Sequence, residues 1–357
     1  MRKDLLRIVR QFFPDQELTD IHPYGAGHIN DTYKLDLAGQ EGYLLQRINR
    51  HVFREPEKVM HNIRGVYEHL SEKENQDCLL RPVADRSGNV FYKDTSGEYW
   101  RCFPFFSGTF SPDAPKDAPQ ARRAARVIGQ FLNDLLSLSP ESIEITIPHF
   151  HDPVKRMVHF REVLQLDPVN RKKEAEQEIA SLQEHQSLFS RIATLNLPRR
   201  VVHNDAKISN VLFDRQSGRA RCLIDWDTIM PGVILSDFGD LVRSCTPPVD
   251  ENSTDLSRIE VDMDIFQALC EGFIPPLSSN LSPVEKQYLI TGAPWITLEQ
   301  ALRFLSDYLE GDSYYKTAYP EQNLARTRNQ LRLFQSMLDR QKEMEEIAAP
   351  FLYKDCG

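Results

Sequence analysis

The chain has 357 residues, of which 41% are hydrophobic and 27% are charged, as in ordinary globular proteins. This length allows two domains or one two-lobed unit, and the composition excludes a disordered or fibrous protein. The formal net charge of −9 argues against general affinity for nucleic acid or an anionic membrane, because both need a basic surface that neutralises phosphates.

The cysteines and the N-terminus bear on the cellular compartment. The six cysteines are scattered without a CxxC spacing, which is typical of reduced thiols rather than of a disulfide framework or zinc site. Arg7 and Arg10 interrupt the segment MRKDLLRIVRQFF, so it predicts a short amphipathic helix and not a signal peptide. No apolar run approaches the roughly 18 residues of a membrane span. We therefore expect a cytoplasmic protein.

The N-terminal part combines short strands with a helix. Segments 32–37 and 43–48 alternate apolar and polar residues on either side of the turn AGQEG, which predicts a β-hairpin. Pro56 begins a stretch in which apolar side chains recur at helical spacing. Further strands are expected at LLRPV (79–83), around NVFY (89–92) and at EYWRCFPFF (98–106).

The rest of the chain is mainly helical. SGTFSPDAPKDAP (107–119) is a Pro-rich connector. Helices are expected at 119–138, within 153–195, and at 262–274 and 283–345. Between them, 201–214 and 219–227 are short β-rich runs separated by the turn DRQSG.

These patterns predict an α+β, bilobal architecture. Residues 1–106 would form a small, β-rich, nucleotide-binding lobe. Residues 107–357 would form a larger, mainly helical lobe that carries the catalytic and substrate-binding groups. The polar signatures lie where the two lobes would meet.

The first signature is HNDAKISN (203–210), which lies between two strand-like apolar runs. Its spacing matches the H-x-D-x-x-x-x-N catalytic loop of phosphotransferases, in which the Asp orients a hydroxyl proton and the Asn holds a metal. Asp205 and Asn210 would take these roles, and Lys207 would place a positive charge on the transferring phosphoryl group. Alternatively, Asp205 caps a helix, Asn210 is a turn residue, and Lys207 is a solvated lysine.

The second signature is IDWD (224–227), at the end of an apolar strand. If that strand continues, Asp225 and Asp227 point to opposite faces. Asp225 follows Asn210 by 15 residues, and the intervening turn allows a hairpin that brings the two together. Oxygen ligands of this kind suit Mg²⁺. Asp227 is either a second metal ligand or a turn former.

The third signature is PYGAGHINDTYKL (23–35), with Gly25, Gly27 and then Asn30 at the position of a third glycine. A strand follows it instead of the helix of a dinucleotide-binding fold, so it predicts a glycine-rich phosphate flap between antiparallel strands. Asn30 tolerates a positive φ better than most residues. A plain hairpin turn is the alternative.

Other chemistry finds little support. His149 and His151 have no Cys or third His nearby, which favours packing or loop hydrogen bonding over a metal site. No G-x-S-x-G or Cys/His signature indicates a hydrolase.

The chain resembles the aminoglycoside phosphotransferase and choline kinase group of protein-kinase-like small-molecule kinases, and among them the N-acetylhexosamine 1-kinases. The segments that carry the resemblance span nearly the full length. They are YGAGHIN (24–30), YLLQRIN (43–49), HNDAKISN (203–210), IDWDTIMPG (224–232), DFGD (237–240) and RFLSDYLEGDSYY (303–315).

This resemblance implies a bilobal kinase-like fold, ATP with Mg²⁺, and phosphorylation of the anomeric hydroxyl of an N-acetylhexosamine. Asp205 would be the catalytic base, and Asn210 and Asp225 the metal ligands. The sugar pocket would be bordered by His28, Asp205, Arg303 and Tyr314.

The nucleotide site departs from the kinase pattern. Where kinases carry a strand-three Lys that pairs with the α/β-phosphates, YLLQRIN has Gln46. Either another cation makes this contact, or the site relies on metal and flap amides. We count Gln46 among the candidate nucleotide contacts, together with Gly25, Gly27, Asn30, Phe103 and Phe105.

Two other functions remain open. The chain could phosphorylate another small alcohol, such as an amino alcohol or an aminoglycoside. It could also be a nucleotide-binding pseudokinase, as Gln46 suggests, although the intact Asp205, Asn210 and Asp225 argue against this. Arg303 and Asp307, four residues apart, could instead form a surface ion pair of little energetic value.

Overall fold

The computed structural model describes every residue except 1, 26–28, 40–41, 74–77 and 354–357. Contacts divide the chain into two compact units. Unit 1 comprises residues 1–110, 134–148 and 212–231, and unit 2 comprises residues 111–133, 149–211 and 232–357. The first division point lies near the boundary predicted after residue 106. Two later segments also belong to unit 1, and the roles assigned to the two lobes stay predictions.

Unit 1 contains an antiparallel sheet with the strand order β1–β2–β3–β5–β4. Its strands are β1 (Leu18–Pro23), β2 (Asp31–Leu37), β3 (Tyr43–Arg47), β4 (Tyr92–Lys93) and β5 (Tyr99–Pro104). The predicted hairpin is confirmed, with Thr32 opposite Gln46. The strand predicted at 79–83 is wrong, since these residues form no strand. Pro82 there lacks the backbone donor that a central strand needs.

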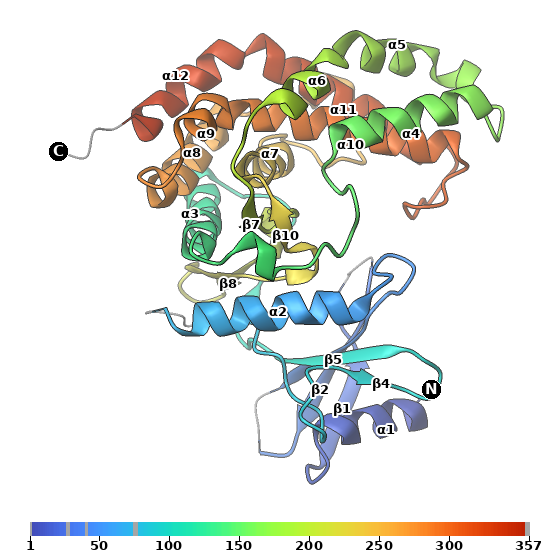
Figure 1. Cartoon of the computed structure of the whole chain (residues 1–357), viewed down its shortest axis with the longest axis vertical. Coiled ribbons are helices and arrows are strands. Elements are labelled where there is room, and N and C mark those ends of the chain that lie inside the picture. Colours follow the sequence, from blue (N-terminus) through green and yellow to red (C-terminus); the bar gives the residue numbers. More distant parts are fainter. Residues whose placement is uncertain (1, 26–28, 40–41, 74–77, 354–357) are drawn as a thin grey trace. The chain divides into compact units, whose positions relative to one another are not determined.

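The two faces of this sheet carry different side chains. Leu35, Leu45 and Cys102 pack with apolar side chains of α1 (Arg2–Phe12). Alternation along the strands turns Gln46 and Arg101 to the other face. That face meets α2 (Pro56–Ser71), whose residue Met60 contacts Arg101, and Figure 1 shows α1 and α2 on opposite sides of the sheet. The helix predicted from Pro56 is confirmed.

A second part of unit 1 carries the IDWD segment. A sheet with the order β6–β8–β9 is formed by β6 (Thr109–Phe110), β8 (Val211–Asp214) and β9 (Ala220–Leu223). It is followed by the 3₁₀ turn η4 (Trp226–Thr228) and by β10 (Met230–Gly232). The β-rich runs predicted around 201–214 and 219–227 are therefore confirmed.

A disulfide joins Cys78 to Cys222, with Cα atoms 5.7 Å apart. The expectation that the thiols are unpaired is wrong for these two residues, because 144 residues of sequence separate them and only the tertiary fold brings them together. Cys102, Cys245 and Cys270 are free and buried. The cytoplasmic location, which relied partly on unpaired cysteines, stays a prediction.

Unit 2 is mainly helical (Figure 1). Its longer helices are α3 (Ala118–Leu135), α4 (Pro153–Leu166), α5 (Glu176–His185), α6 (Ser187–Thr194), α7 (Ile234–Cys245), α8 (Met263–Leu277), α9 (Pro283–Tyr288), α10 (Gly292–Leu309), α11 (Gln322–Asp339) and α12 (Gln341–Leu352). Shorter elements are β7 (Arg200–Val202) and the 3₁₀ turns η2 (Lys172–Ala175), η3 (Ile208–Asn210), η5 (Leu256–Arg258) and η6 (Leu289–Thr291). The expected helical regions are confirmed. In the described part of the chain, no helix combines the length and apolarity needed to cross a membrane.

Helix α10 is central to unit 2, where it packs against α11, α7 and α4. Its approach to α7 requires a glycine in the DFGD segment. A Cβ atom on Gly239 would lie 2.2 Å from the carbonyl oxygen of Gly292, far inside van der Waals contact. This close packing fixes α7, the helix that supports the HNDAKISN loop.

Candidate active site

The HNDAKISN loop connects β7 to β8 and ends in the short 3₁₀ turn η3. Asp205 is 27% exposed, and its carboxylate accepts hydrogen bonds from Lys207 Nζ at 2.9 Å and Asn210 Nδ2 at 3.0 Å. The 3₁₀ turn has Lys207 at its N-cap position, without a side-chain cap. The helix-cap interpretation of Asp205 is therefore wrong, and Lys207 is not an ordinary solvated lysine.

The surroundings of Asp205 keep it ionised. Burial alone would raise the pKa of this carboxyl, but the Lys207 ammonium group, with help from His203 and Asn210, lowers the pKa to about 2. The charged form is favoured because an opposite charge and hydrogen-bond donors both stabilise it. Asp205 can therefore accept a hydrogen bond from a hydroxyl group at neutral pH.

Asp237 of α7 holds the loop from inside. Its fully buried carboxylate accepts hydrogen bonds from the backbone N–H groups of His203, at 2.7 Å, and Asn204, at 2.6 Å. Burial raises the pKa of Asp237 to about 7, against the effect of these two donors. Asn204 has a φ of 63°, a left-handed conformation that Asn tolerates. These contacts fix the backbone conformation of the two residues that precede Asp205.

His151 contacts the same loop from the segment before α4. Its Nδ1 lies 2.8 Å from Glu299 Oε1 and its Nε2 lies 3.2 Å from the Asn204 carbonyl oxygen. Burial alone would lower the pKa of His151, but Glu299 raises it above its usual value. An imidazolium donates from both nitrogens and so satisfies both acceptors. The expected loop hydrogen bonding of His151 is confirmed.

The IDWD segment differs from the extended strand that was expected. Strand β9 ends at Leu223, Asp225 has a φ of 63°, and residues 226–228 form the turn η4. The strand does not continue, so the condition for placing the two carboxylates on opposite faces is not met. The Asp225 side chain is exposed, whereas Asp227 is only 3% exposed.

A row of polar side chains crosses the sheet of unit 1. Thr32, Gln46 and Arg101 are paired in register across β2, β3 and β5. Gln46 Nε2 donates to Thr32 Oγ1, and Arg101 Nε donates to Gln46 Oε1, both at 3.0 Å. Arg101 then binds Asp227 through both terminal nitrogens, at 2.8 Å for the Nη2–Oδ2 contact. Gln46 is therefore half-buried and part of a network that ends in the buried Arg101–Asp227 pair.

This network reaches the glycine-rich segment. Asn30 Nδ2 donates to Asp227 Oδ2 at 2.8 Å, and Asn30 Oδ1 accepts from the backbone of Asn49 at 3.0 Å. Asn30 does not have a positive φ, so its role is hydrogen bonding rather than turn geometry. Both Asp227 oxygens already accept bonds from protein donors. These contacts favour a structural role for Asp227 over the metal role.

A model of the phosphotransferase enzyme family, abbreviated APH, matches residues 20–268. The chain belongs to the APH family. This match covers β2, β3, the HNDAKISN loop, the IDWD segment and α7, whereas α1 and α10, the helix of Glu299, lie outside it.

Solved structures show the same fold. A structure of amicoumacin kinase with AMP-PNP, Ca²⁺ and amicoumacin has a TM-score of 0.64 at 13% identity, over 92% of each chain. Aminoglycoside 2'-phosphotransferase-IIIa with GDP has a TM-score of 0.61 at 14% identity, over 92% of this chain and 98% of the other. An aminoglycoside phosphotransferase from Alicyclobacillus acidocaldarius has a TM-score of 0.58 at 14% identity, over 98% and 95%. The expected α+β, protein-kinase-like fold is confirmed.

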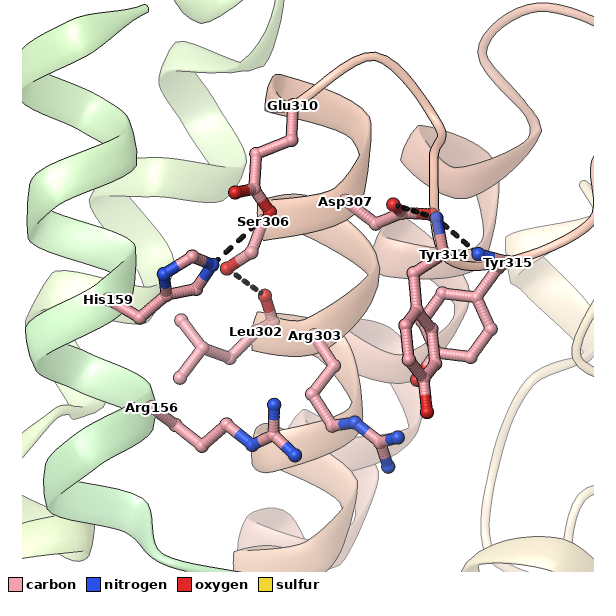
Figure 2. Close-up of a pocket in the computed structure, with 9 residues that line it drawn as sticks. All are labelled: Arg156, His159, Leu302, Arg303, Ser306, Asp307, Glu310, Tyr314 and Tyr315. Carbon is pink, nitrogen blue, oxygen red and sulfur yellow. Dashed lines mark hydrogen bonds and ion pairs between the residues drawn. The ribbon is translucent and has the colours of Figure 1, made fainter. Parts of the chain in front are cut away.

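In this APH chain, unit 2 contains a pocket of about 110 Å³ between α4, α10 and the segment after α10 (Figure 2). Arg303 and Tyr314, predicted as sugar contacts, both line it. The alternative of an Arg303–Asp307 surface ion pair is wrong. Arg303 Nη1 donates to Gln300 Oε1 at 3.1 Å, and Asp307 accepts from the backbone of Tyr314 at 2.7 Å. Of the other two predicted sugar contacts, His28 lies outside the described residues and Asp205 is not among the residues that line this pocket.

The remaining nucleotide candidates occupy unit 1. Gly25 has a φ of 77°, as a glycine turn requires, and Gly27 lies outside the described residues. Phe103 is 4% exposed beneath the Arg101 guanidinium, 5.2 Å from its ring centre. Phe105 is half-buried and meets the Tyr24 ring edge-on at 5.2 Å. None of these contacts tests nucleotide binding, so their roles stay predictions.

Sequence reasoning missed three residues of this candidate site. Arg101 could have been suspected, because it is the one charge within the apolar strand YWRCF. Asp237 belongs to the DFGD segment, but its bonds to the catalytic loop depend on the path of α7. Arg156 of α4 lines the pocket, but no sequence pattern distinguishes it from the many surface arginines of charged helices.

Proposed function

We propose that this APH phosphotransferase transfers the γ-phosphoryl group of ATP, with Mg²⁺, to the anomeric C1 hydroxyl of an N-acetylhexosamine or related hexose. The observation that carries the proposal is the pocket of Figure 2. Its aromatic rings and guanidinium groups suit an uncharged sugar, which is recognised by stacking and by hydrogen bonds to its oxygens. Arg156, which lines the pocket, donates to the carbonyl oxygen of Phe150. The next residue, His151, contacts the HNDAKISN loop.

Local contacts support the catalytic roles that we propose. Asp205 would orient the sugar hydroxyl and accept its proton. Lys207 would turn its ammonium group toward the transferred phosphoryl group. Asn210 uses its amide nitrogen to bind Asp205, and its side-chain oxygen accepts no hydrogen bond from the described residues. That oxygen and the exposed Asp225 carboxylate fit the ligand preference of Mg²⁺, which would neutralise charge on the phosphates.

The metal role of Asp225 makes a first prediction. Asp225→Ala is expected to weaken Mg²⁺-dependent nucleotide binding and to abolish transfer, because it removes a charged oxygen ligand. Titration calorimetry with ATP, with and without Mg²⁺, measures the effect. Asp339→Ala, at the exposed end of α11, is the control. Identical Mg-ATP affinity in Asp225→Ala and the wild type would contradict the assignment.

A kinase of another small alcohol is the second candidate. Two of the similar solved structures are named as aminoglycoside phosphotransferases. However, an aminoglycoside is a polycation and needs unpaired carboxylates. The pocket carboxylates of Asp307 and Glu310 are occupied by backbone N–H groups and by His159, respectively. ATP consumption over a panel of sugars, amino alcohols and aminoglycosides distinguishes the candidates. A pseudokinase would consume ATP with none of them.

Arg303 allows a second prediction. Arg303→Ala is expected to raise the sugar KM about ten- to a hundredfold with little change in the KM for ATP, because a buried acceptor on the sugar loses its donor. Steady-state kinetics measures both constants, and NMR of the product locates the phosphate. Arg161→Ala, on the solvent-exposed side of α4, is the control. An unchanged sugar KM, or phosphate at a position other than C1, would refute the assignment.

A further inference from the structure

The pocket of Figure 2 contains two guanidinium groups from different helices. Arg156 extends from α4 and Arg303 from α10, and their side chains lie next to each other at one end of the pocket (Figure 2). Two like charges in a partly buried site repel each other, so such an arrangement is retained only where something compensates the charge.

No carboxylate among the described residues forms an ion pair or hydrogen bond with either guanidinium group, and the buried Glu299 carboxylate, which attracts both, is already bound to His151. Arg303 donates to the Gln300 side chain and lies over the Phe150 and Tyr315 rings, at 5.3 and 5.7 Å. Arg156 donates from Nη2 to the Phe150 carbonyl oxygen at 3.0 Å. Its Nε is buried and has no acceptor within the described part of the chain. Buried donors are normally paired, so this nitrogen indicates an acceptor that the protein does not supply.

The acidic side chains of the pocket are already engaged. Asp307 accepts from the backbone N–H groups of Tyr314 and Tyr315 and from Asn323 Nδ2, at 2.7, 2.9 and 2.9 Å. Glu310 lies 3.2 Å from His159 Nε2. The arginine end of the pocket therefore offers positive charge and donors to a ligand, whereas the two carboxylates keep their charge but offer few free acceptor positions for an ammonium group.

We propose that Arg156, together with Arg303, selects the acceptor by charge, so that an acylated amino sugar is accepted and the same sugar with a free ammonium group is rejected. The acyl carbonyl oxygen accepts hydrogen bonds from the guanidinium groups, whereas an ammonium group is a third cation beside them. Arg156 is then a specificity-determining residue. This inference rests on the proposed sugar kinase function, and the experiment separates the two.

The experiment compares N-acetylglucosamine with glucosamine. In the wild type, kcat/KM for N-acetylglucosamine is expected to exceed that for glucosamine at neutral pH. The difference between the two kcat/KM values should become smaller at higher pH, because the glucosamine ammonium group loses its proton and its charge. In Arg156→Gln, which keeps a donor without the charge, the ratio of the two kcat/KM values should fall about ten- to a hundredfold. A purely structural defect would lower both values together and leave the ratio unchanged.

Calorimetric titration of both sugars supplies a readout that does not need transfer, and Arg161→Gln on the same helix is the control. One outcome separates the two proposals. If N-acetylglucosamine binds more tightly than glucosamine and Arg156→Gln reduces this difference in affinity, charge selection is supported. If neither sugar is phosphorylated in the same experiments, the proposed kinase function fails. Charge selection is overturned by equal or tighter binding of glucosamine, by a ratio that Arg156→Gln leaves unchanged, or by no binding of either sugar.

Discussion

Asp205→Asn is expected to lower kcat by about 10²–10⁴-fold while nucleotide binding survives. The asparagine keeps the size of the side chain but removes the negative charge that accepts the hydroxyl proton. With its pKa lowered to about 2, Asp205 is a weak base. We therefore expect it to orient the hydroxyl through most of the reaction and to receive the proton late, when bonding to phosphorus has made the oxygen acidic.

The measurement combines steady-state kinetics with calorimetric titration of Mg-ATP. Because the pKa of Asp205 is lowered to about 2, we expect its protonation to reduce the kcat of the wild type only well below neutral pH. Asp214→Asn, at the half-buried last residue of β8, is the control. Unchanged turnover in Asp205→Asn would end the catalytic assignment.

Arg101→Met is expected to reduce the free energy of unfolding by about 3–5 kcal/mol. Arg101 and Asp227 are 2% and 3% exposed, and removal of the guanidinium leaves the Asp227 carboxylate without its ionic partner in a low-dielectric site. The same change deprives Gln46 Oε1 of its donor. A loss of this size is a large part of the roughly 5–15 kcal/mol that stabilises a typical domain.

Denaturant unfolding measures the loss, and the sheet of unit 1 provides a matched control. Arg47 pairs with Asp31 on neighbouring β3 and β2, but these side chains are 44% and 51% exposed. Arg47→Met should therefore cost no more than about 1 kcal/mol. If Arg101→Met does not fold, Asp227→Asn, which keeps a hydrogen-bond acceptor for Arg101, provides a second measurement. Equal losses in Arg101→Met and Arg47→Met would refute the importance of the buried pair.

The position of Gln46 shows why a missing motif residue is hard to interpret from sequence. The sequence YLLQRIN shows that Gln46 replaces the kinase lysine. The consequence depends on Arg101 and Asp227, which follow Gln46 by 55 and 181 positions. Cross-strand register sets Arg101 opposite Gln46, and the η4 turn presents Asp227 to it. Register and turn geometry are properties of the fold, so no local pattern predicts this network.

The elements were predictable where their signals are local. The β2–β3 hairpin follows from alternation around a turn, and α2 from helical spacing after Pro56. The HNDAKISN loop was predictable because polar residues interrupt two apolar strands at a spacing that phosphoryl transfer requires. The prediction at IDWD failed in its geometry, since the left-handed φ of Asp225 ends the strand that the apolar residues began.

The sequence by itself determined the family and the α+β class, because short-range spacing encodes helices, strands and loop motifs, and it also provided the proposed site residues. Only the tertiary structure decided which charges are compensated. Asp227 is paired by Arg101 and Asp237 by two backbone N–H groups, whereas Arg156 and Arg303 form no ion pair or hydrogen bond with a carboxylate among the described residues. Whether a charge is structural or available to a ligand depends on atoms within a few ångströms that come from distant parts of the chain.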